Sequence, residues 1–168
     1  MAIEFARISI HSRSKGHSAV AGAAYRAGVL LHDERTGEVH DFEKRHDVTY
    51  SSIMLPDGAD QKFSDRETLW NQVEAAEKRK DAQLAKDVVL ALPRELEIGS
   101  HIELARQFSY DNFVKHGLAV DIAIHDHGDG NPHAHLYVTT RRIVVDRLDK
   151  YKARDLNPSF ANWKGGQG

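Results

Sequence analysis

Residues 120–140, VDIAIHDHGDGNPHAHLYVTT, contain two stretches in which apolar residues alternate with others, separated by a segment rich in Gly, Asp and Asn. This alternation has the period of a β-strand, in which successive side chains point to opposite faces of a sheet. The intervening DHGDGNP supplies residues that tolerate the backbone angles of a tight connection. The sequence therefore predicts an antiparallel hairpin whose apolar face is formed by Val120, Ile122, Ile124, Ala134, Leu136 and Val138.

The opposite face of this hairpin carries histidines. His133 and His135 are two residues apart and share a face of the second strand, whereas His125 ends the first strand and meets His133 across the turn. A lone strand histidine is usually packed or solvated, but three on one face favour a divalent cation site, because imidazole is a common metal ligand. His127 is an alternative third ligand, but it lies inside the turn, so His125 is preferred. Three histidines admit Mn, Mg, Zn, Ni or Co, although Mg normally prefers oxygen ligands. Mn or Mg is the first expectation for the metal, with Zn, Ni and Co as alternatives.

The composition excludes several classes of protein. The chain has 168 residues, which fits one domain, and it has no cysteine, which excludes disulfides and thiolate zinc sites. No run approaches the roughly 20 apolar residues of a membrane span, and the N-terminus lacks the apolar core of a signal peptide. We expect no membrane partner, and a cytoplasmic location is compatible with these features.

The net charge of −2 gives no indication of a polyanionic partner, but the charges are unevenly distributed. Residues 1–31 hold four Arg and Lys residues against one Glu, and residues 141–154 hold six against two Asp. A solvated face is the simpler interpretation of such segments, but together they can also line an electropositive groove. The cations available for this groove are Arg13, Lys15, Arg26, Arg141, Arg142, Arg147, Lys150, Lys152 and Arg154.

Strands and helices are expected to alternate along the chain. Periodicity, caps and turn residues predict strands at 3–11, 48–56 and 86–93, a short ribbon at 35–42, and helices at 19–31, 65–80 and 94–117. Ser18 and Asp65 are the expected caps of the first two helices. The first helix is rich in Ala and Gly, so we expect it to lie close against a sheet. The predicted fold is an α/β two-layer sandwich with a central, mainly antiparallel sheet. Residues 1–155 are expected to form one domain, and 156–168 a flexible tail or linker.

No familiar nucleophile motif accompanies the histidines. The sequence lacks a GxSxG elbow and a phosphate-binding GxxxxGK[ST] loop. A metal-bound water or a side-chain hydroxyl then has to act as the nucleophile. Spacing alone does not select among the five tyrosines, Tyr25, Tyr50, Tyr110, Tyr137 and Tyr151.

Two segments carry a family resemblance. SRSKGHSAVAGAAYRAG at 12–28 and DGNPHAHLYVTTR at 129–141 resemble the MobA/MobL-type conjugative relaxases, a class that includes the TraA proteins of rhizobial and agrobacterial plasmids. These enzymes are HUH endonucleases, named for two histidines that flank a hydrophobic residue, here His133-Ala134-His135. The resemblance implies that Tyr25 is the nucleophile and that His125, His133 and His135 hold the metal.

The resemblance also implies a reaction and partners. Tyr25 would attack one phosphodiester of single-stranded DNA at the transfer origin, leaving a 5′-phosphotyrosyl adduct and a free 3′ hydroxyl that can later be rejoined. Accessory proteins of the relaxosome and a type IV secretion coupling protein are the implied partners. Relatives carry glutamates in the strand before ALP, where this chain has Asp87 and Val89. Asp87 is therefore the first candidate for a base, whereas Asp121, on the face of His125, is a candidate for orienting a ligand histidine.

Four alternatives stay open at this point. A rolling-circle replication initiator would use a downstream tyrosine such as Tyr151, and a metal phosphoesterase would use bound water. A non-catalytic DNA-binding module would keep the fold without turnover, and a histidine-triad nucleotide hydrolase would need more alternating histidines. Stacking platforms for DNA bases are available in Tyr137, Phe160 and Trp163.

Overall fold

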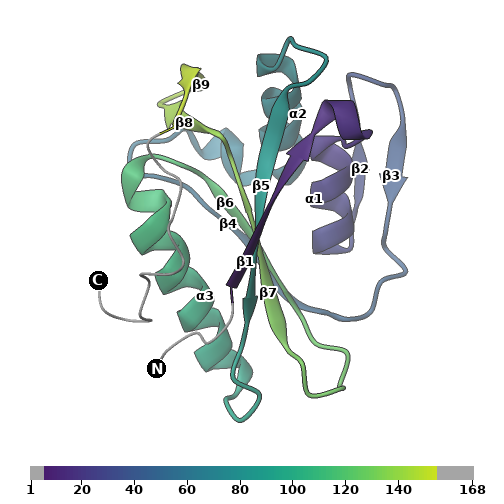
Figure 1. The fold of residues 1–168 in the computed structure, drawn as a ribbon, viewed down its shortest axis with the longest axis vertical. Coiled ribbons are helices and arrows are strands. Elements are labelled where there is room, and N and C mark those ends of the chain that lie inside the picture. Colours follow the sequence, from purple (N-terminus) through teal and green to yellow (C-terminus); the bar gives the residue numbers. More distant parts are fainter. Residues whose placement is uncertain (1–5, 155–168) are drawn as a thin grey trace.

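The computed structural model describes residues 6–154, which form an antiparallel sheet covered by helices (Figure 1). The sheet has five strands in the order β1-β5-β7-β6-β4. Every neighbouring pair in it is antiparallel. The strands are β1 (Ala6–Ser12), β4 (Val48–Met54), β5 (Gln83–Ala91), β6 (Val120–His125) and β7 (His133–Val138). Two separate ribbons pair β2 (Leu30–His32) with β3 (Val39–Asp41) and β8 (Arg141–Val144) with β9 (Arg147–Lys152).

The predicted histidine hairpin is confirmed. β6 and β7 pair in a register that places His125 directly opposite His133 and Ala123 opposite His135. The even-numbered residues of both strands are buried in one core cluster, as the alternation of the sequence predicts. The histidines therefore lie on the other face of the sheet.

The sheet is the middle of three layers. The helix α3 (Ile98–Asn112) packs on the face of Val120 and Leu136, whereas α1 (Ala19–Ala27) and α2 (Arg66–Ala76) cover the face of Tyr137. Figure 1 shows α3 on one side of the strands and α1 and α2 on the other. The expected α/β class with an antiparallel sheet is confirmed. Helices cover both faces, so the sheet has two cores rather than the single interface of a two-layer sandwich.

The helix α1 carries Tyr25 and lies very close to the sheet. The Ser18 hydroxyl accepts a hydrogen bond from the Ala21 amide and caps the helix start, as predicted. A Cβ added to Gly22 would lie 2.3 Å from the Tyr137 hydroxyl oxygen, so only glycine permits this approach. The expectation that α1 continues to Leu31 is wrong: Gly28 adopts φ 68° and ends the helix, and the chain turns into β2.

Several other elements differ from the sequence expectation. The helix α2 ends at Ala76 instead of Lys80, and α3 begins at Ile98 instead of Arg94. The basic segment after Thr140 is a β-ribbon, β8–β9, whereas alternation there was too weak to predict it. Among residues 6–154, no helix has the length and apolar character needed to cross a membrane. The expected tail at 156–168 lies outside the described residues.

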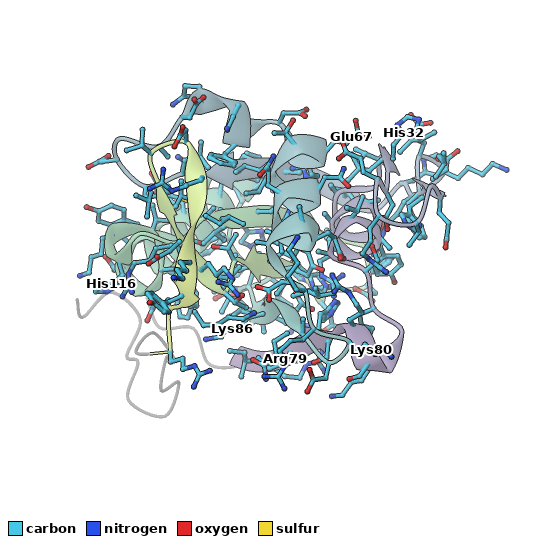
Figure 2. All side chains as sticks on the ribbon, turned by 90° about the horizontal axis from the view of Figure 1, so that it is seen from above. His32, Glu67, Arg79, Lys80, Lys86 and His116 are labelled. Carbon is cyan, nitrogen blue, oxygen red and sulfur yellow. The ribbon has the colours of Figure 1, made fainter. Side chains whose placement is uncertain are left out.

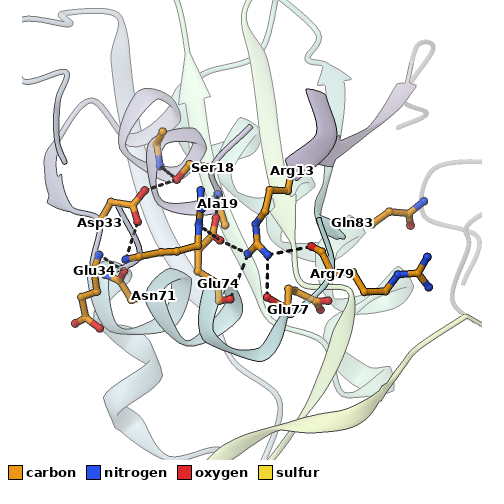
Figure 3. Close-up of polar contacts among 12 residues, drawn as sticks. Arg13, Ser18, Ala19, Asp33, Glu34, Asn71, Glu74, Glu77, Arg79 and Gln83 are labelled. Carbon is orange, nitrogen blue, oxygen red and sulfur yellow. Dashed lines mark hydrogen bonds and ion pairs between the residues drawn. The ribbon is translucent and has the colours of Figure 1, made fainter. Parts of the chain in front are cut away.

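A buried carboxylate joins the elements around α1. The Glu74 side chain of α2, 2% exposed, accepts hydrogen bonds from the Ala19 amide at 2.7 Å and from Arg13 at 2.6 Å. Arg35, between β2 and β3, donates to the same carboxylate at 3.1 Å. Figure 3 shows Arg13 and Ala19 converging on Glu74. Because Glu74 binds the first turn of α1 and two cations, it fixes this helix on the sheet.

Candidate active site

Three histidines converge at one end of the sheet. His125, His133 and His135 each offer a ring nitrogen, and these three atoms lie within 4.8 Å of one another. The ring centroids of His125 and His135 are 4.7 Å apart. His125 is fully buried, whereas the other two are partly exposed, so the cluster opens toward solvent on one side.

Each ring of the cluster is oriented by one hydrogen bond to an oxygen. The His133 Nδ1 lies 3.0 Å from the Asn131 carbonyl oxygen, and the His135 Nδ1 lies 3.1 Å from an Asp87 carboxylate oxygen. The His125 Nε2 donates to the Arg26 carbonyl oxygen at 2.7 Å. A ring that donates from one nitrogen presents a lone pair at the other, so the set fits a divalent cation. Three nitrogen donors suit Zn, Ni or Co more than Mg, which prefers oxygen.

The cluster contains His125 and excludes His127. Burial lowers the pKa of His125 to about 4, so this ring is neutral near pH 7, as a metal ligand must be. The side chain of His127 is 53% exposed and binds Asp47 at 3.1 Å. Its ring centroid lies 6.3 Å from that of His133.

Asp87 is the carboxylate that contacts a histidine of the cluster. It is buried on β5 between His135 and Arg26, whose guanidinium donates to it at 2.9 Å. Burial alone would raise the pKa of Asp87, but the hydrogen bonds from His135 and Arg26 outweigh burial and hold the pKa well below its usual range. The ionised form is therefore strongly favoured, which makes Asp87 a weak base and a strong partner for the ring of His135.

Asp121 lies elsewhere on the same face. Arg66 of α2 binds it through two hydrogen bonds, at 2.7 and 2.9 Å, and the Trp70 ring nitrogen donates to it at 3.0 Å. Asp121 thus joins α2 to the sheet and does not orient His125, contrary to the expectation from the sequence.

Tyr25 lies at the C-terminal end of α1, beside the cluster. Tyr25 is 47% exposed, and its ring is flanked by the Phe42 ring at 5.3 Å and by the Arg45 guanidinium at 4.4 Å. The next residue, Arg26, supplies the carbonyl oxygen that His125 binds. Successive residues of α1 thus present a tyrosine and hold a histidine of the cluster.

The loop between β3 and β4 completes the site. A groove at this position is lined by Tyr25, Lys44, Arg45, His46, Asp47 and His127, among others. The Arg45 guanidinium donates to both carboxylate oxygens of Asp47, at 2.6 and 2.8 Å, and to the Tyr25 carbonyl oxygen at 2.9 Å. Nothing in the segment FEKRHD distinguishes these residues in the sequence, where they follow a predicted ribbon.

The other cations selected from the sequence fall into two groups. Arg13, Arg26 and Arg141 are engaged in ion pairs with Glu74, Asp87 and Glu77, and Lys152 also pairs with Glu77. The Arg142 guanidinium donates to the His116 carbonyl oxygen. The exposed members are Lys15, Arg147, Lys150 and Arg154.

Most of these cations lie at the end of the sheet opposite the histidines. The Lys152 ammonium donates to the Gln83 carbonyl at the start of β5, whereas His133 pairs with Ala91 at its end. Eight residues of strand separate the two positions by about 25 Å. Figure 2 views the molecule from above, with Arg79 and Lys86 on the same side of it.

Comparisons with known proteins give the chain a family. The model of the MobA/MobL family matches residues 17–166. The probable mobilization protein MobA of Bifidobacterium longum (strain NCC 2705) is 39% identical over 144 residues, which cover 85% of this chain and 26% of that protein. The conjugal transfer protein TraA of Agrobacterium fabrum (strain C58 / ATCC 33970) is 37% identical over 156 residues, covering 87% of this chain and 14% of TraA.

A solved structure agrees with these sequences. The structure described as "Molecular Basis of Vancomycin Resistance Transfer in Staphylococcus aureus" superposes with a TM-score of 0.83 at 36% identity, covering 90% of this chain and 78% of that one. The chain thus spans only a minor part of the curated relatives quoted above, but most of the solved chain. The resemblance found in residues 12–28 and 129–141 is confirmed, and the chain belongs to the MobA/MobL family.

Proposed function

We propose that this chain nicks single-stranded DNA at a plasmid transfer origin, with Tyr25 as the nucleophile and a divalent cation held by His125, His133 and His135. One observation carries the proposal. Tyr25 is joined to the histidine cluster from two sides, through Arg45, which contacts both Tyr25 and His125, and through the Arg26 carbonyl.

The positions of the other tyrosines support this assignment. Tyr137 is fully buried beneath α1, where a DNA phosphate has no access. Tyr50 packs against the core under α3, and Tyr110 lies on α3 itself, both on the far side of the sheet from the cluster. Tyr151 lies on β9, which Figure 1 places at the opposite end of the sheet from the turn between β6 and β7. The downstream tyrosine of the replication-initiator alternative is thus remote from the histidines.

In the proposed reaction the Tyr25 hydroxyl oxygen bonds to the phosphorus of one phosphodiester and the bond from phosphorus to the 3′ oxygen breaks. The hydroxyl proton is lost from Tyr25, and the 3′ oxygen gains a proton, so one phosphodiester is exchanged for another and the step is reversible. A cation bound at the three histidines supplies neutralising charge to the phosphate oxygens. Asp87 fixes the ring of His135, and Asp121 anchors α2 without touching the site.

The DNA is proposed to approach along the groove beside Tyr25, which Lys44 and Arg45 line together with Asp41, Asp47 and Asp126. The exposed cations Lys15, Arg147, Lys150 and Arg154 would add contacts to phosphates beyond the site, and Arg26 would act only through its neighbours because it is buried. By family, residues 1–155 would form the nicking domain, acting in the bacterial cytoplasm with relaxosome proteins and a coupling protein.

The test is covalent capture of DNA. Labelled single-stranded oligonucleotides from candidate transfer origins are incubated with the protein and Mn²⁺, and the products are separated in SDS. The wild type and Tyr110→Phe should give a protein-linked band, whereas Tyr25→Phe should bind DNA without forming one. Tyr110 is the matched control because its exposure, 46%, equals that of Tyr25 within one per cent.

Each competing function gives a different pattern. Cleavage without a protein-linked band would indicate a metal phosphoesterase, and binding that is insensitive to EDTA without any product would indicate a DNA-binding module. Loss of the band in Tyr151→Phe but not in Tyr25→Phe would indicate the replication-initiator arrangement.

A further inference from the structure

Arg45 contacts several groups of the candidate active site, although the proposed reaction gives it no role. Its guanidinium binds Asp47 through two hydrogen bonds, the Tyr25 carbonyl oxygen at 2.9 Å, and the His125 Nδ1 at 3.2 Å. It also lies 4.4 Å from the centre of the Tyr25 ring. One side chain therefore contacts the proposed nucleophile, through backbone and ring, and one proposed metal ligand.

The contact with His125 fixes which nitrogen carries the proton. A guanidinium is always protonated and can only donate, so the Nδ1 of His125 accepts. The Nε2 must then carry the hydrogen, in agreement with its short bond of 2.7 Å to the Arg26 carbonyl. The lone pair that His125 would offer to a cation is thus the one that receives the Arg45 hydrogen bond.

The contact with Tyr25 has an equally clear physical role. The last carbonyls of a helix lack amide partners, and a cation placed there satisfies them and interacts favourably with the helix dipole. Arg45 and His125 bind two consecutive carbonyls at this end of α1, those of Tyr25 and Arg26. Asp47 holds Arg45 in this place, and its own carbonyl oxygen accepts from the Asp126 amide at 2.9 Å in the turn between β6 and β7.

We propose that Arg45 is a positioning residue that couples the nucleophile to the metal centre: it fixes Tyr25 at the end of α1 and releases the His125 lone pair when a cation binds. The proposal rests on the proposed function of Tyr25 and of the three histidines. Arg45 then has two opposite effects. Its charge and its hydrogen bond to His125 weaken the binding of the cation, whereas its contacts with Tyr25 favour the reaction.

The test is the variant Arg45→Met, compared with Arg79→Met. Arg79 binds Asp81, two residues later, through two hydrogen bonds as Arg45 binds Asp47, but it is exposed and remote from the histidines. Two quantities are measured: the affinity for Mn²⁺ alone by titration calorimetry without DNA, and the rate of covalent capture of DNA. Loss of one charged hydrogen bond to His125 should raise the Mn²⁺ affinity of Arg45→Met about tenfold. Its rate of capture should fall at least about tenfold, and Arg79→Met should match the wild type in both.

Opposite changes are the signature of the proposal, because a variant that is merely less well folded loses both metal affinity and capture. An Mn²⁺ affinity that stays constant or falls in a folded Arg45→Met protein overturns the coupling, as does an unchanged rate of capture. If Arg45→Met does not fold, Arg45→Lys decides. Lysine keeps the charge but loses the planar fork and with it the hydrogen bond to His125, so capture should fall and Mn²⁺ affinity should rise, by less than in Arg45→Met because the charge remains. A rate of capture that does not fall, or an Mn²⁺ affinity that does not rise, in a folded Arg45→Lys protein contradicts the proposal. If the wild type captures no DNA, the proposed function fails, whereas the Mn²⁺ titration still decides whether Arg45 competes for His125.

Discussion

Substitution of Gly22 by alanine tests the close contact on which the position of Tyr25 depends. The added Cβ would lie 2.3 Å from the hydroxyl oxygen of Tyr137 and 2.8 Å from the ring carbon that carries it. Tyr137 cannot withdraw, because it is fully buried between the Trp70 ring at 4.4 Å and the Arg26 guanidinium at 4.8 Å. The helix α1 must therefore move away from the sheet, together with Tyr25 one turn further along.

Two opposing effects set the magnitude. Overpacking of a rigid core costs up to about 3 kcal/mol. Alanine regains about 1 kcal/mol over glycine inside a helix. The free energy of unfolding of Gly22→Ala should therefore fall by about 2 kcal/mol, which corresponds to a fall in Tm of roughly 4–8 °C for a chain of this size.

Thermal and urea unfolding followed by circular dichroism measure this loss. Gly99→Ala is the matched control, because no atom lies within 4 Å of the Cβ added at this position of α3. The free energy of unfolding of Gly99→Ala should exceed that of the wild type by up to about 1 kcal/mol. The double variant Gly22→Ala/Tyr137→Phe should regain part of the loss, since it removes the oxygen at 2.3 Å. A Gly22→Ala protein as stable as the wild type would refute the close packing of α1 on Tyr137.

Three further predictions concern the groups around the site. Asp87→Asn should lower the affinity for Mn²⁺ roughly 10- to 100-fold in titration calorimetry, because His135 loses the carboxylate that orients its ring. The free energy of unfolding, measured in urea, should fall as the pH drops from about 6.5 to about 4. Burial is the main cause that lowers the pKa values of His11 and His125 to about 4 in the folded protein, whereas histidines of the unfolded chain take up protons near pH 6.5. The dependence of the free energy of unfolding on pH should therefore approach a slope of two protons per molecule. Glu74→Gln should lower the free energy of unfolding by about 3 kcal/mol, because it breaks a buried ion pair.

Each of these predictions has its own contradicting result, and the Glu74 variant has a matched control. An Asp87→Asn protein with unchanged Mn²⁺ affinity would separate this carboxylate from the metal site. A stability that is constant between pH 6.5 and pH 4 would show that the two histidines take up protons in the folded state. Glu67→Gln is the control for Glu74, because the Glu67 side chain is 39% exposed and its loss should cost less than about 1 kcal/mol. Figure 2 shows Glu67 beside His32.

The histidine hairpin could be predicted because alternation along a strand is a direct record of which face is buried. The register of β6 and β7 follows once the even-numbered residues face the core, and His125 then has to meet His133. The helix starts at Ser18 and Asp65 were also predictable, since both side chains cap the helix through a local hydrogen bond. The end of α1 was not, because the apolar residues Val29, Leu30 and Leu31 continue past Gly28, at which the backbone turns.

The roles of the two aspartates could not be separated by parity alone. Parity places Asp121 and His125 on one face, but they are four residues apart along β6, roughly 13 Å. Asp87 reaches His135 diagonally across the pairing of β5 with β7, in which Val89 lies opposite His135. The sequence pattern gives the face of a residue, whereas its neighbour depends on the order of strands in the sheet.

Charged residues were the least predictable part of the site. Arg13 and Arg141 stand in basic segments, which suggested a DNA-binding surface, but each pairs with a glutamate more than 60 residues away. Arg45 follows an acidic stretch and carries no signal of its own, because its partners Tyr25 and His125 are 20 and 80 residues distant. Such contacts form only when the loop between β3 and β4 packs against the end of α1.

Mass spectrometry tests directly whether Tyr25 becomes covalently bound to DNA. The protein is incubated with a transfer-origin oligonucleotide and Mn²⁺, digested with nuclease and protease, and the modified peptide is sequenced. A nucleotide should be attached through its 5′ phosphate to Tyr25, in a peptide from α1. A nucleotide on Tyr151 or on any other residue, or cleaved DNA with no modified peptide, would contradict it.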